Sequence, residues 1–290
     1  MNYKGKTAVI TGAASGLGLG IARACAVRGM KLVLTDIDAP KLYEVSRELS
    51  DSGVEVLAQA ANVAEVDDME RLAYLAFESF GAVHLLFNNA GVLGDSSMLD
   101  AMIKDWEWIM GVNLWGVINC IRAFVPRMLE SGQTGRVVNI ADAAGFLSGP
   151  GAGIYRMTKQ AVVSLSESLY HELTLLPSKI GVSVVAPSFV KTGIMEGEKN
   201  RPVKMQCCAR IPVANEMEES MRVFFTQQVE AAPEPEMVAE EIFAGIGEDK
   251  LYIFVPSMFQ EPITRELIRQ RMESIVSERN PDTFIPGAGY

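Results

Sequence analysis

Short runs of β-branched and other apolar residues alternate along this chain with longer segments of helical periodicity. The predicted strands are 7–11, 31–36 and the runs that begin at 55, 83, 136, 181 and 251. The predicted helices are 16–29, 39–52, 66–80, 101–130, 151–176 and an amphipathic helix that ends at about 279. Strands that are apolar almost throughout are typical of a parallel sheet covered by helices on both faces, and right-handed crossovers make such a sheet open and doubly wound. We therefore predict one α/β domain of Rossmann type over residues 1–290.

Composition limits the classes of function. The chain has 290 residues, and 49% of them are hydrophobic, which is enough for a sizeable core. Lys and Arg number 26 against 36 Asp and Glu, a net charge of −10 without a basic block, which argues against nucleic acid or an anionic membrane as partner. No uninterrupted apolar run reaches about 18 residues. The N-terminal residues MNYKGKTAVITG lack the pattern of a secretory signal. We expect a cytoplasmic protein.

The cysteines and histidines do not indicate a metal site or a disulfide framework. No C-x-x-C pair is present, and neither histidine stands at ligand spacing from a cysteine. Cys25 and Cys120 lie in apolar helical stretches and are expected in the core. Cys207 and Cys208 lie in a more polar stretch, where a reactive thiol is the less favoured alternative.

Two segments interrupt the alternation. Residues 188–235, rich in Met, Glu and Pro, follow the end of a strand, where open α/β sheets bind their ligands. We interpret them as a substrate lid; the alternative is an ordinary pair of surface helices. The second segment is the tail 280–290, which ends a C-terminal helix-and-tail region over 257–290.

A glycine cluster joins the first strand to the first helix. Gly12, Gly16 and Gly18 are spaced G-x-x-x-G-x-G, with Ser15 and Leu17 between them. Glycine lets the backbone turn sharply and leaves no side chain between the loop and a diphosphate. The helix N-terminus adds unpaired N–H groups and partial positive charge. This position between strand and helix favours a dinucleotide site over a plain tight turn.

Asp36 ends the second strand, 18 residues after Gly18. A carboxylate at this point can accept both ribose hydroxyls of NAD and repels the 2′-phosphate of NADP. No basic residue stands at Ser15 or Ile37 to favour the phosphate. The sequence therefore favours NAD; the structural alternative for Asp36 is a helix N-cap, because Asp36 and Asp38 precede the next helix.

Tyr155 and Lys159 lie four residues apart in a helical segment, so their side chains share one face. An ammonium group beside a phenol favours the phenolate and lowers the pKa of the phenol. A phenol tuned in this way can give or take the proton that accompanies a hydride transfer. By itself the pair is common by chance, but here it follows a strand in a chain that has a dinucleotide loop.

Together these motifs resemble the short-chain dehydrogenase/reductase family across residues 5–256. The matching residues, in family order, are the glycine loop, Asn88-Asn89-Ala90-Gly91, Asn113, the Tyr155/Lys159 pair and Pro187. The resemblance implies that the glycine loop cradles the diphosphate and Asp36 takes the adenosine ribose. It also implies further cofactor contacts from Asn62, Val63, Asn89, Ala90, Gly91, Tyr155, Lys159, Pro187, Val190 and Thr192.

In this resemblance Asn113 orders a water in a proton relay from Lys159, and Thr192 touches the nicotinamide amide. Two of the assignments have structural alternatives. Asn88 and Asn89 are also suited to tying strands together, and Thr192 to capping a helix. The resemblance further implies a homodimer or homotetramer that assembles through the long fourth and fifth helices.

The chain departs from the family at one chemically central place. The family has a serine 13 residues before the tyrosine, where it hydrogen-bonds the substrate oxygen; this chain has Asp142. Ser148 is a weak substitute, because it falls in a loop. An ionised Asp142 cannot donate a hydrogen bond and raises the pKa of Tyr155 by repulsion. A neutral Asp142 in a dry pocket can donate as a carboxyl group.

Three interpretations of Asp142 stay open. The favoured one is a protonated, donating carboxyl group that makes Asp142 catalytic alongside Asn113, Tyr155 and Lys159. The second is weakened or lost turnover. The third is a substrate whose amine or hydroxyl group prefers an aspartate.

A narrower likeness bears on the substrate. Residues 111–117, 124–128 and 199–202 resemble bacterial members that oxidise bulky secondary alcohols, including aryl-ether Cα-alcohol dehydrogenases. Phe189, Met195 and Met205 in the predicted lid suit a large apolar molecule. We therefore predict an NAD-dependent oxidoreductase that interconverts a bulky secondary alcohol and its ketone. The alternative is an NAD-binding sensor or scaffold that has lost turnover because of Asp142.

Overall fold

A computed structural model describes residues 2–94, 98–147, 149, 151–206, 216–255 and 261–280. Ser148, Cys207, Cys208 and the tail beyond residue 280, all named in the sequence analysis, lie outside the described residues.

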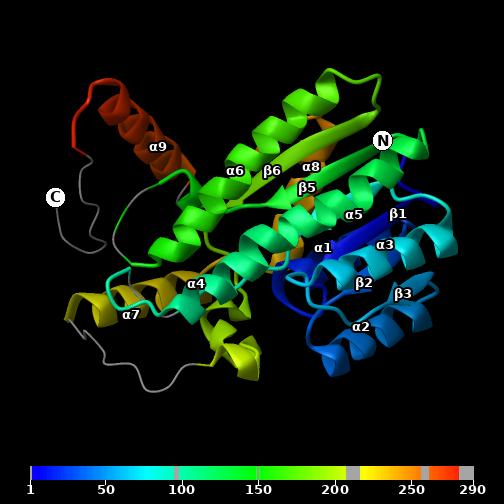
Figure 1. The fold of residues 1–290 in the computed structure, drawn as a ribbon, viewed down its shortest axis with the longest axis horizontal. Coiled ribbons are helices and arrows are strands. Elements are labelled where there is room, and N and C mark those ends of the chain that lie inside the picture. The colour runs from blue at the N-terminus through cyan, green and yellow to red at the C-terminus, as the bar shows by residue number, and fades with distance from the viewer. Residues whose placement is uncertain are drawn as a thin grey trace.

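The described chain forms a seven-stranded sheet in the order β3-β2-β1-β4-β5-β6-β7, and every pair of neighbouring strands is parallel. The strands are β1 (Thr7–Thr11), β2 (Lys31–Thr35), β3 (Val56–Ala58), β4 (Leu85–Asn88), β5 (Gly135–Ile140), β6 (Ile180–Pro187) and β7 (Tyr252–Val255). The predicted Rossmann-type, doubly wound parallel sheet in a single domain is confirmed. Because the strands are parallel, all their carboxyl ends lie at one edge of the sheet (Figure 1).

Helices cover both faces of this sheet (Figure 1). They are α1 (Gly16–Val27), α2 (Ala39–Asp51), α3 (Val66–Phe80), α4 (Ile103–Met110), α5 (Gly116–Glu130), α6 (Gly153–Thr174), α7 (Glu216–Glu230), α8 (Pro235–Gly247) and α9 (Glu261–Val276). Core side chains of α1, α2 and α8 pack on one face, and those of α3, α5 and α6 pack on the other.

Successive side chains of a strand point to opposite faces of the sheet. In β1, Ala8 and Ile10 belong to the core under α1 and α8, whereas Val9 belongs to the core under α3 and α5. Leu86 of β4 faces the same way as Val9, and Phe87 faces the opposite way. This period of two explains why the strands are apolar throughout: both faces are buried. Cys25 and Cys120 are buried as expected, and burial raises the pKa of both thiols.

The predicted helix over 101–130 differs in detail. Residues 103–130 are helical throughout, but α4 and α5 are separated by η1 (Gly111–Trp115), a π-helical turn of five residues. Such turns occur frequently at functional sites, because they shift the side chains that follow. The sequence analysis also assigned no helix to 235–247, where the structure has α8.

This long helical stretch is apolar enough to cross a membrane by length and composition, a property that the search for an uninterrupted apolar run did not identify. Of its most apolar window, 56% is buried inside the protein. Val117, Cys120 and Phe124 of α5 are part of the core against the sheet. The same test is met by the core helices of many water-soluble proteins, and the packing of α5 matches that case.

The segment predicted as a lid contains two short 3₁₀ helices, η3 (Gly193–Asn200) and η4 (Val203–Met205), followed by α7. In Figure 1, α7 and α9 lie beside the sheet edge at which the strands end, away from the N-terminus. The helix α7 of this segment therefore lies at the edge of the sheet where the strands end.

Candidate active site

A cavity of about 1090 Å³ opens at the carboxyl ends of the strands. Its lining includes the residues that follow five strands: Gly12, Asp36, Asn89, Ala141 and Ser188. Every residue assigned by the sequence analysis to the cofactor, other than Gly18, lines this cavity. Of the predicted catalytic residues, Asp142, Tyr155 and Lys159 line it as well.

The glycine loop is as tight as its sequence requires. Gly12 has a φ of +65°, and a Cβ on Gly12 would lie 3.0 Å from the Cα of Ala90. A Cβ on Gly18 would overlap the carbonyl oxygen of Gly12. Gly18 therefore allows α1 to pack closely against the loop. Gly12 has a backbone conformation that residues with a side chain rarely adopt.

The N-terminus of α1 is open toward the cavity. Ser15 is the N-cap residue, yet its side chain caps no backbone N–H group, and the first turn carries no acidic residue. Ser15, Gly16 and Leu17 line the cavity. Exposed N–H groups and the positive end of the helix dipole fit an anion such as a diphosphate.

Asp36 holds the loop from the side of β2. Its Oδ2 accepts a hydrogen bond from the N–H of Ala14 at 2.9 Å, and its Oδ1 accepts one from the N–H of Asp38 at 3.0 Å. The N-cap of α2 is Asp38, which accepts from the N–H of Lys41. The alternative role of Asp36 as the helix cap is therefore excluded by this geometry.

Asn88 and Asn89 connect the ends of neighbouring strands, which is the structural role named for them as an alternative in the sequence analysis. Asn89 Nδ2 donates to the carbonyl oxygen of Thr11 at 2.9 Å, and Asn88 Nδ2 donates to Asn139 Oδ1 at 2.7 Å. Thr11 Oγ1 in turn accepts from the N–H groups of Asn89 and Ala90. These bonds fix the backbone that lines the cavity from Asn89 to Gly91, so the asparagines shape the site and Asn89 also lines it.

Asn113 lies in η1 and is buried. Its Oδ1 accepts from the N–H of Val92 at 2.8 Å, while Nδ2 donates to the carbonyl oxygen of Val92 at 2.9 Å and to Thr158 Oγ1 at 3.2 Å. Both ends of the amide are thus engaged by protein atoms. The side chain fixes the chain after β4 against α6, and the ordering of a relay water by Asn113 stays a prediction.

The central pair of the site is Tyr155 with Asp142. The hydroxyl of Tyr155 donates to Asp142 Oδ2 at 2.8 Å. Asp142 Oδ1 accepts from the N–H of Ala144 at 2.7 Å. Because Oδ1 is held by a donor, a proton on this carboxyl group belongs on Oδ2, the oxygen that faces Tyr155.

Burial shifts the acidities of this pair in one direction. It raises the pKa of Asp142 above its ordinary value. It also raises the pKa of Tyr155 well above its ordinary value, and the charge of Asp142 adds to this increase. The expectation that Lys159 lowers the pKa of Tyr155 is not met here, because burial and Asp142 dominate.

Lys159 is itself buried, and burial lowers its pKa to about 8. Its Nζ donates to the carbonyl oxygen of Ile140 at 2.9 Å and lies 5.5 Å from the centre of the Tyr155 ring. The ammonium group is therefore anchored to the end of β5, beside the reacting pair.

Several lining residues were not identified from the sequence, among them Ser188, Arg156 and Arg271. The Oγ of Ser188 is buried without a hydrogen-bond partner in the described structure. Arg156 and Arg271 line the same cavity from α6 and α9. The sequence offers a signal only for Arg156, which directly follows Tyr155. Ser188 and Arg271 reach the cavity through long-range packing, which no local pattern predicts.

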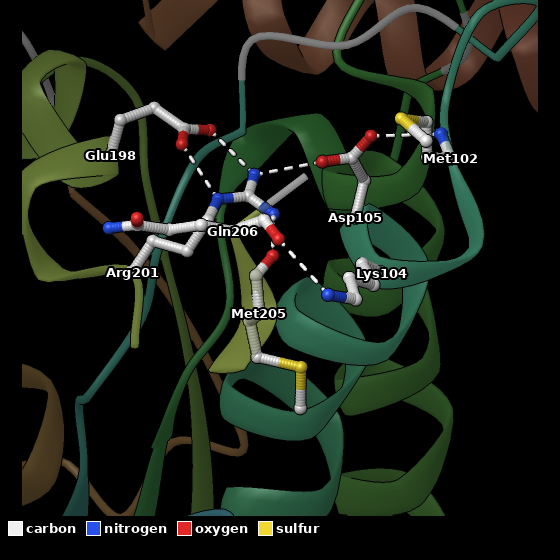
Figure 2. A network of polar contacts seen from close by, with 7 residues as sticks. All are labelled: Met102, Lys104, Asp105, Glu198, Arg201, Met205 and Gln206. Carbon is white, nitrogen blue, oxygen red and sulfur yellow. Dashed lines mark hydrogen bonds and ion pairs between the residues drawn. The ribbon is translucent and has the colours of Figure 1, made fainter. Parts of the chain in front are cut away.

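A buried ion cluster fixes the lid segment to α4 (Figure 2). Arg201 donates to both carboxylate oxygens of Glu198 at 2.7 Å and forms an ion pair with Asp105 at 2.9 Å. The side chains of Arg201 and Asp105 are 5% and 0% exposed. The guanidinium also lies 4.1 Å from the centre of the Trp108 ring. Arg201 thus ties the segment that follows η3 to α4.

Comparison with known proteins agrees with this geometry. The family model described as short chain dehydrogenase matches residues 6–202. The "CLA biosynthesis dehydrogenase/reductase" of Lactiplantibacillus plantarum is 30% identical over 98% of both chains. The "C alpha-dehydrogenase" of Sphingobium sp. (strain NBRC 103272 / SYK-6) is 32% identical over 97% of this chain and 88% of its own length.

A solved structure shares the whole fold. The crystal structure of a short chain dehydrogenase/reductase from Burkholderia phymatum in complex with NAD has a TM-score of 0.90 and 36% sequence identity. The match covers 98% of this chain and 99% of that chain.

Proposed function

Because this chain belongs to the short chain dehydrogenase family of oxidoreductases, we propose that it interconverts a bulky secondary alcohol and its ketone, with NAD as cofactor. The observation that carries the proposal is the hydrogen bond between the buried Tyr155 and the half-buried Asp142, which both line a large cavity beside a glycine loop. Bound NAD supplies the nicotinamide that takes a hydride from the carbinol carbon or returns it.

The residues present fit a dinucleotide. The uncapped N-terminus of α1 suits the diphosphate, and Gly12 and Gly16 add no side chain of their own where Asn89 and Thr192 approach the loop. Each oxygen of Asp36 accepts one backbone N–H group, so the carboxylate keeps lone pairs for two ribose hydroxyls. A second negative charge, the 2′-phosphate of NADP, would be repelled there. These features support NAD.

The remaining cavity suits an apolar alcohol. Phe189, Met195 and Met205 line it, and the Phe189 ring packs against Phe225 at 6.0 Å between ring centres. Such walls provide burial for a large apolar substrate, while the few polar groups fix its orientation. Similarity to the C alpha-dehydrogenase named above supports an alcohol of this kind.

The proton path follows from the geometry of Asp142. In the oxidation direction, the substrate hydroxyl gives its proton to the Tyr155 oxygen as Tyr155 passes its own proton to Asp142 Oδ2, 2.8 Å away. In the reduction direction the neutral carboxyl group returns the proton through Tyr155 to the ketone oxygen. Asp142, at the position where the family has a serine, then serves as the proton store of the site, with Lys159 and Arg156 as the neighbouring cations that act on it.

We expect Asp142→Asn to shift the pH dependence of alcohol oxidation toward alkaline pH. In the wild type, oxidation needs an ionised Asp142, so kcat/KM rises as pH passes the raised pKa of this carboxyl group. Without the carboxylate, the proton must go to a Tyr155 phenolate, which burial disfavours. Steady-state kinetics from pH 5 to 10 check this, with Asp142→Ser as the residue usual in the family. An unchanged rate and pH profile in both variants would exclude Asp142 from catalysis.

We expect Asp36→Ala to weaken NAD binding by about tenfold or more, because hydrogen bonds to a charged group contribute about 1.5–3 kcal/mol. The buried N–H of Ala14 also loses its acceptor, so thermal stability falls. Asp38→Ala is the matched control, since it removes only the cap of α2, at a cost of about 0.5–2 kcal/mol. Calorimetric titration with NAD and NADP separates the two; equal NAD affinities in both variants would contradict the assignment.

The activity is tested by following nicotinamide absorbance with NAD and NADP against a panel of secondary aryl and alicyclic alcohols, with nucleotide binding measured in parallel. Turnover with NAD supports the proposal. Tight NAD binding without turnover on any alcohol supports the sensor alternative, for which the Tyr155–Asp142 bond is the structural argument. Failure to bind either nucleotide would overturn both.

The proposal includes a homodimer or homotetramer formed through α5 and α6. An apolar groove between these helices, lined by Ile118, Ile121, Leu165 and Leu169, supports it. Light scattering of the purified protein is expected to give two or four times the mass of 31.6 kDa.

A further inference from the structure

Two arginines line the end of the cavity formed by α6 and α9. Arg156 Nε donates to the carbonyl oxygen of Gly151 at 3.2 Å, and Arg271 Nη1 donates to that of Phe146 at 2.9 Å. Both carbonyl groups belong to the connection between β5 and α6. Each arginine is therefore held by one backbone carbonyl group, and both residues line the cavity.

Neither guanidinium forms an ion pair within the described residues. This is unusual in a chain with 36 acidic and 26 basic residues, where Arg23, Arg28 and Arg201 all have carboxylate partners. Partly buried arginines are ordinarily paired, because removing the charge from water is costly. Burial indeed lowers the pKa of Arg156 below its ordinary value.

The acidic residues that line the cavity do not form ion pairs with Arg156 or Arg271 within the described structure. Asp142 acts electrostatically on Arg156, but both of its oxygens are held, by the N–H of Ala144 and the hydroxyl of Tyr155. Glu65 is paired with Lys204 at 3.0 Å. Asp36 holds the glycine loop. Glu107, the remaining described acid of the lining, belongs to α4 and forms no hydrogen bond or ion pair with either arginine. Among the described residues, Arg156 and Arg271 therefore have no carboxylate partner.

We propose that Arg156 and Arg271 form a subsite for a carboxylate, so that the substrate is an apolar secondary alcohol that also carries a carboxylic acid group. A guanidinium presents paired N–H groups that match the two oxygens of a carboxylate. Thr264 and Gln270 of α9 line the same region and offer further polar contacts, while Leu267 covers the apolar body. The proposed substrate class rests on the proposed alcohol dehydrogenase function. Binding of a carboxylate by Arg156 and Arg271 does not depend on that function.

Binding of a simple probe tests the subsite without turnover. Calorimetry of the full chain, with and without NAD, compares 4-phenylbutanoate with the neutral 4-phenylbutanamide. We expect the acid to bind about tenfold or more tightly, the effect of a hydrogen bond to a charged group. Arg271→Gln and Arg156→Gln should each remove most of this preference, and Arg271→Lys should keep part of it.

Arg269→Gln is the matched control, because Arg269 lies on the same helix but is 57% exposed and paired with Glu266 and Glu273. It makes the same change of charge away from the cavity and should leave the preference intact. Equal binding of acid and amide, absence of acid binding, or equal effects of the Arg271 and Arg269 variants would each overturn the subsite. An arginine-dependent acid preference without turnover on any alcohol would keep the subsite and refute the dehydrogenase function.

Discussion

Tyr155→Phe is expected to lower kcat for alcohol oxidation by about 100- to 10,000-fold, the usual contribution of a positioned acid or base. The variant removes one oxygen atom, the atom that connects the substrate hydroxyl to Asp142 Oδ2. The ring stays buried in α6, and Lys159 keeps its bond to Ile140. NAD affinity should therefore change little while turnover is lost, and stopped-flow assays with parallel nucleotide titration separate the two.

Tyr170→Phe is the matched control for this experiment. Tyr170 belongs to the same helix and is 39% exposed. Wild-type kcat is expected in that variant. A Tyr155→Phe enzyme that keeps kcat within a few-fold of wild type would show that the proton leaves the substrate by another path.

Arg201→Met is expected to lower the free energy of unfolding by about 3–5 kcal/mol, because it leaves Asp105 as a buried charge without its cation. Asp105 is 0% exposed, and the N–H of Met102, which donates to it at 2.9 Å, brings no positive charge to replace that of Arg201. Figure 2 shows that the same guanidinium connects Asp105 with Glu198, so the lid loses its attachment to α4 as well. Urea unfolding followed by circular dichroism measures the loss.

Arg269→Met provides the comparison, because exposed ion pairs contribute about 0–1 kcal/mol. Adding Asp105→Asn to Arg201→Met removes the uncompensated charge and should recover part of the stability. A loss below about 1 kcal/mol in the Arg201 variant would show that the buried pair stabilises nothing beyond an exposed one.

The fold was predictable because its signals are local. The strands β1, β4, β5 and β6 carry apolar runs that are buried on both faces. The glycine loop stands between β1 and α1, as the sequence order required. The π-helical turn at Gly111–Trp115 was not predictable, since helical periodicity does not distinguish it from the α-helix on either side. The helix α8 is clear in the structure, but in the sequence it follows a Pro- and Glu-rich stretch that obscured its start.

The candidate site divides in the same way. Tyr155, Lys159 and Asp36 could be identified from short motifs, and their places at the cavity follow from where the strands end. The ion pair between Asp105 and Arg201 joins residues 96 positions apart, and Arg271 meets Phe146 across 125 positions. No periodic pattern encodes such pairs, so they emerge only from tertiary packing.

The double use of Asp36 constrains how this enzyme could change over generations. The carboxylate that we propose for the ribose also accepts the N–H of Ala14. Replacing Asp36 by a basic residue, to accept a phosphorylated ribose, would also remove the hydrogen-bond acceptor of the Ala14 N–H group in the loop. A second substitution that gives Ala14 a new acceptor would have to come first. A change of cofactor preference at Asp36 therefore also changes the stability of the glycine loop.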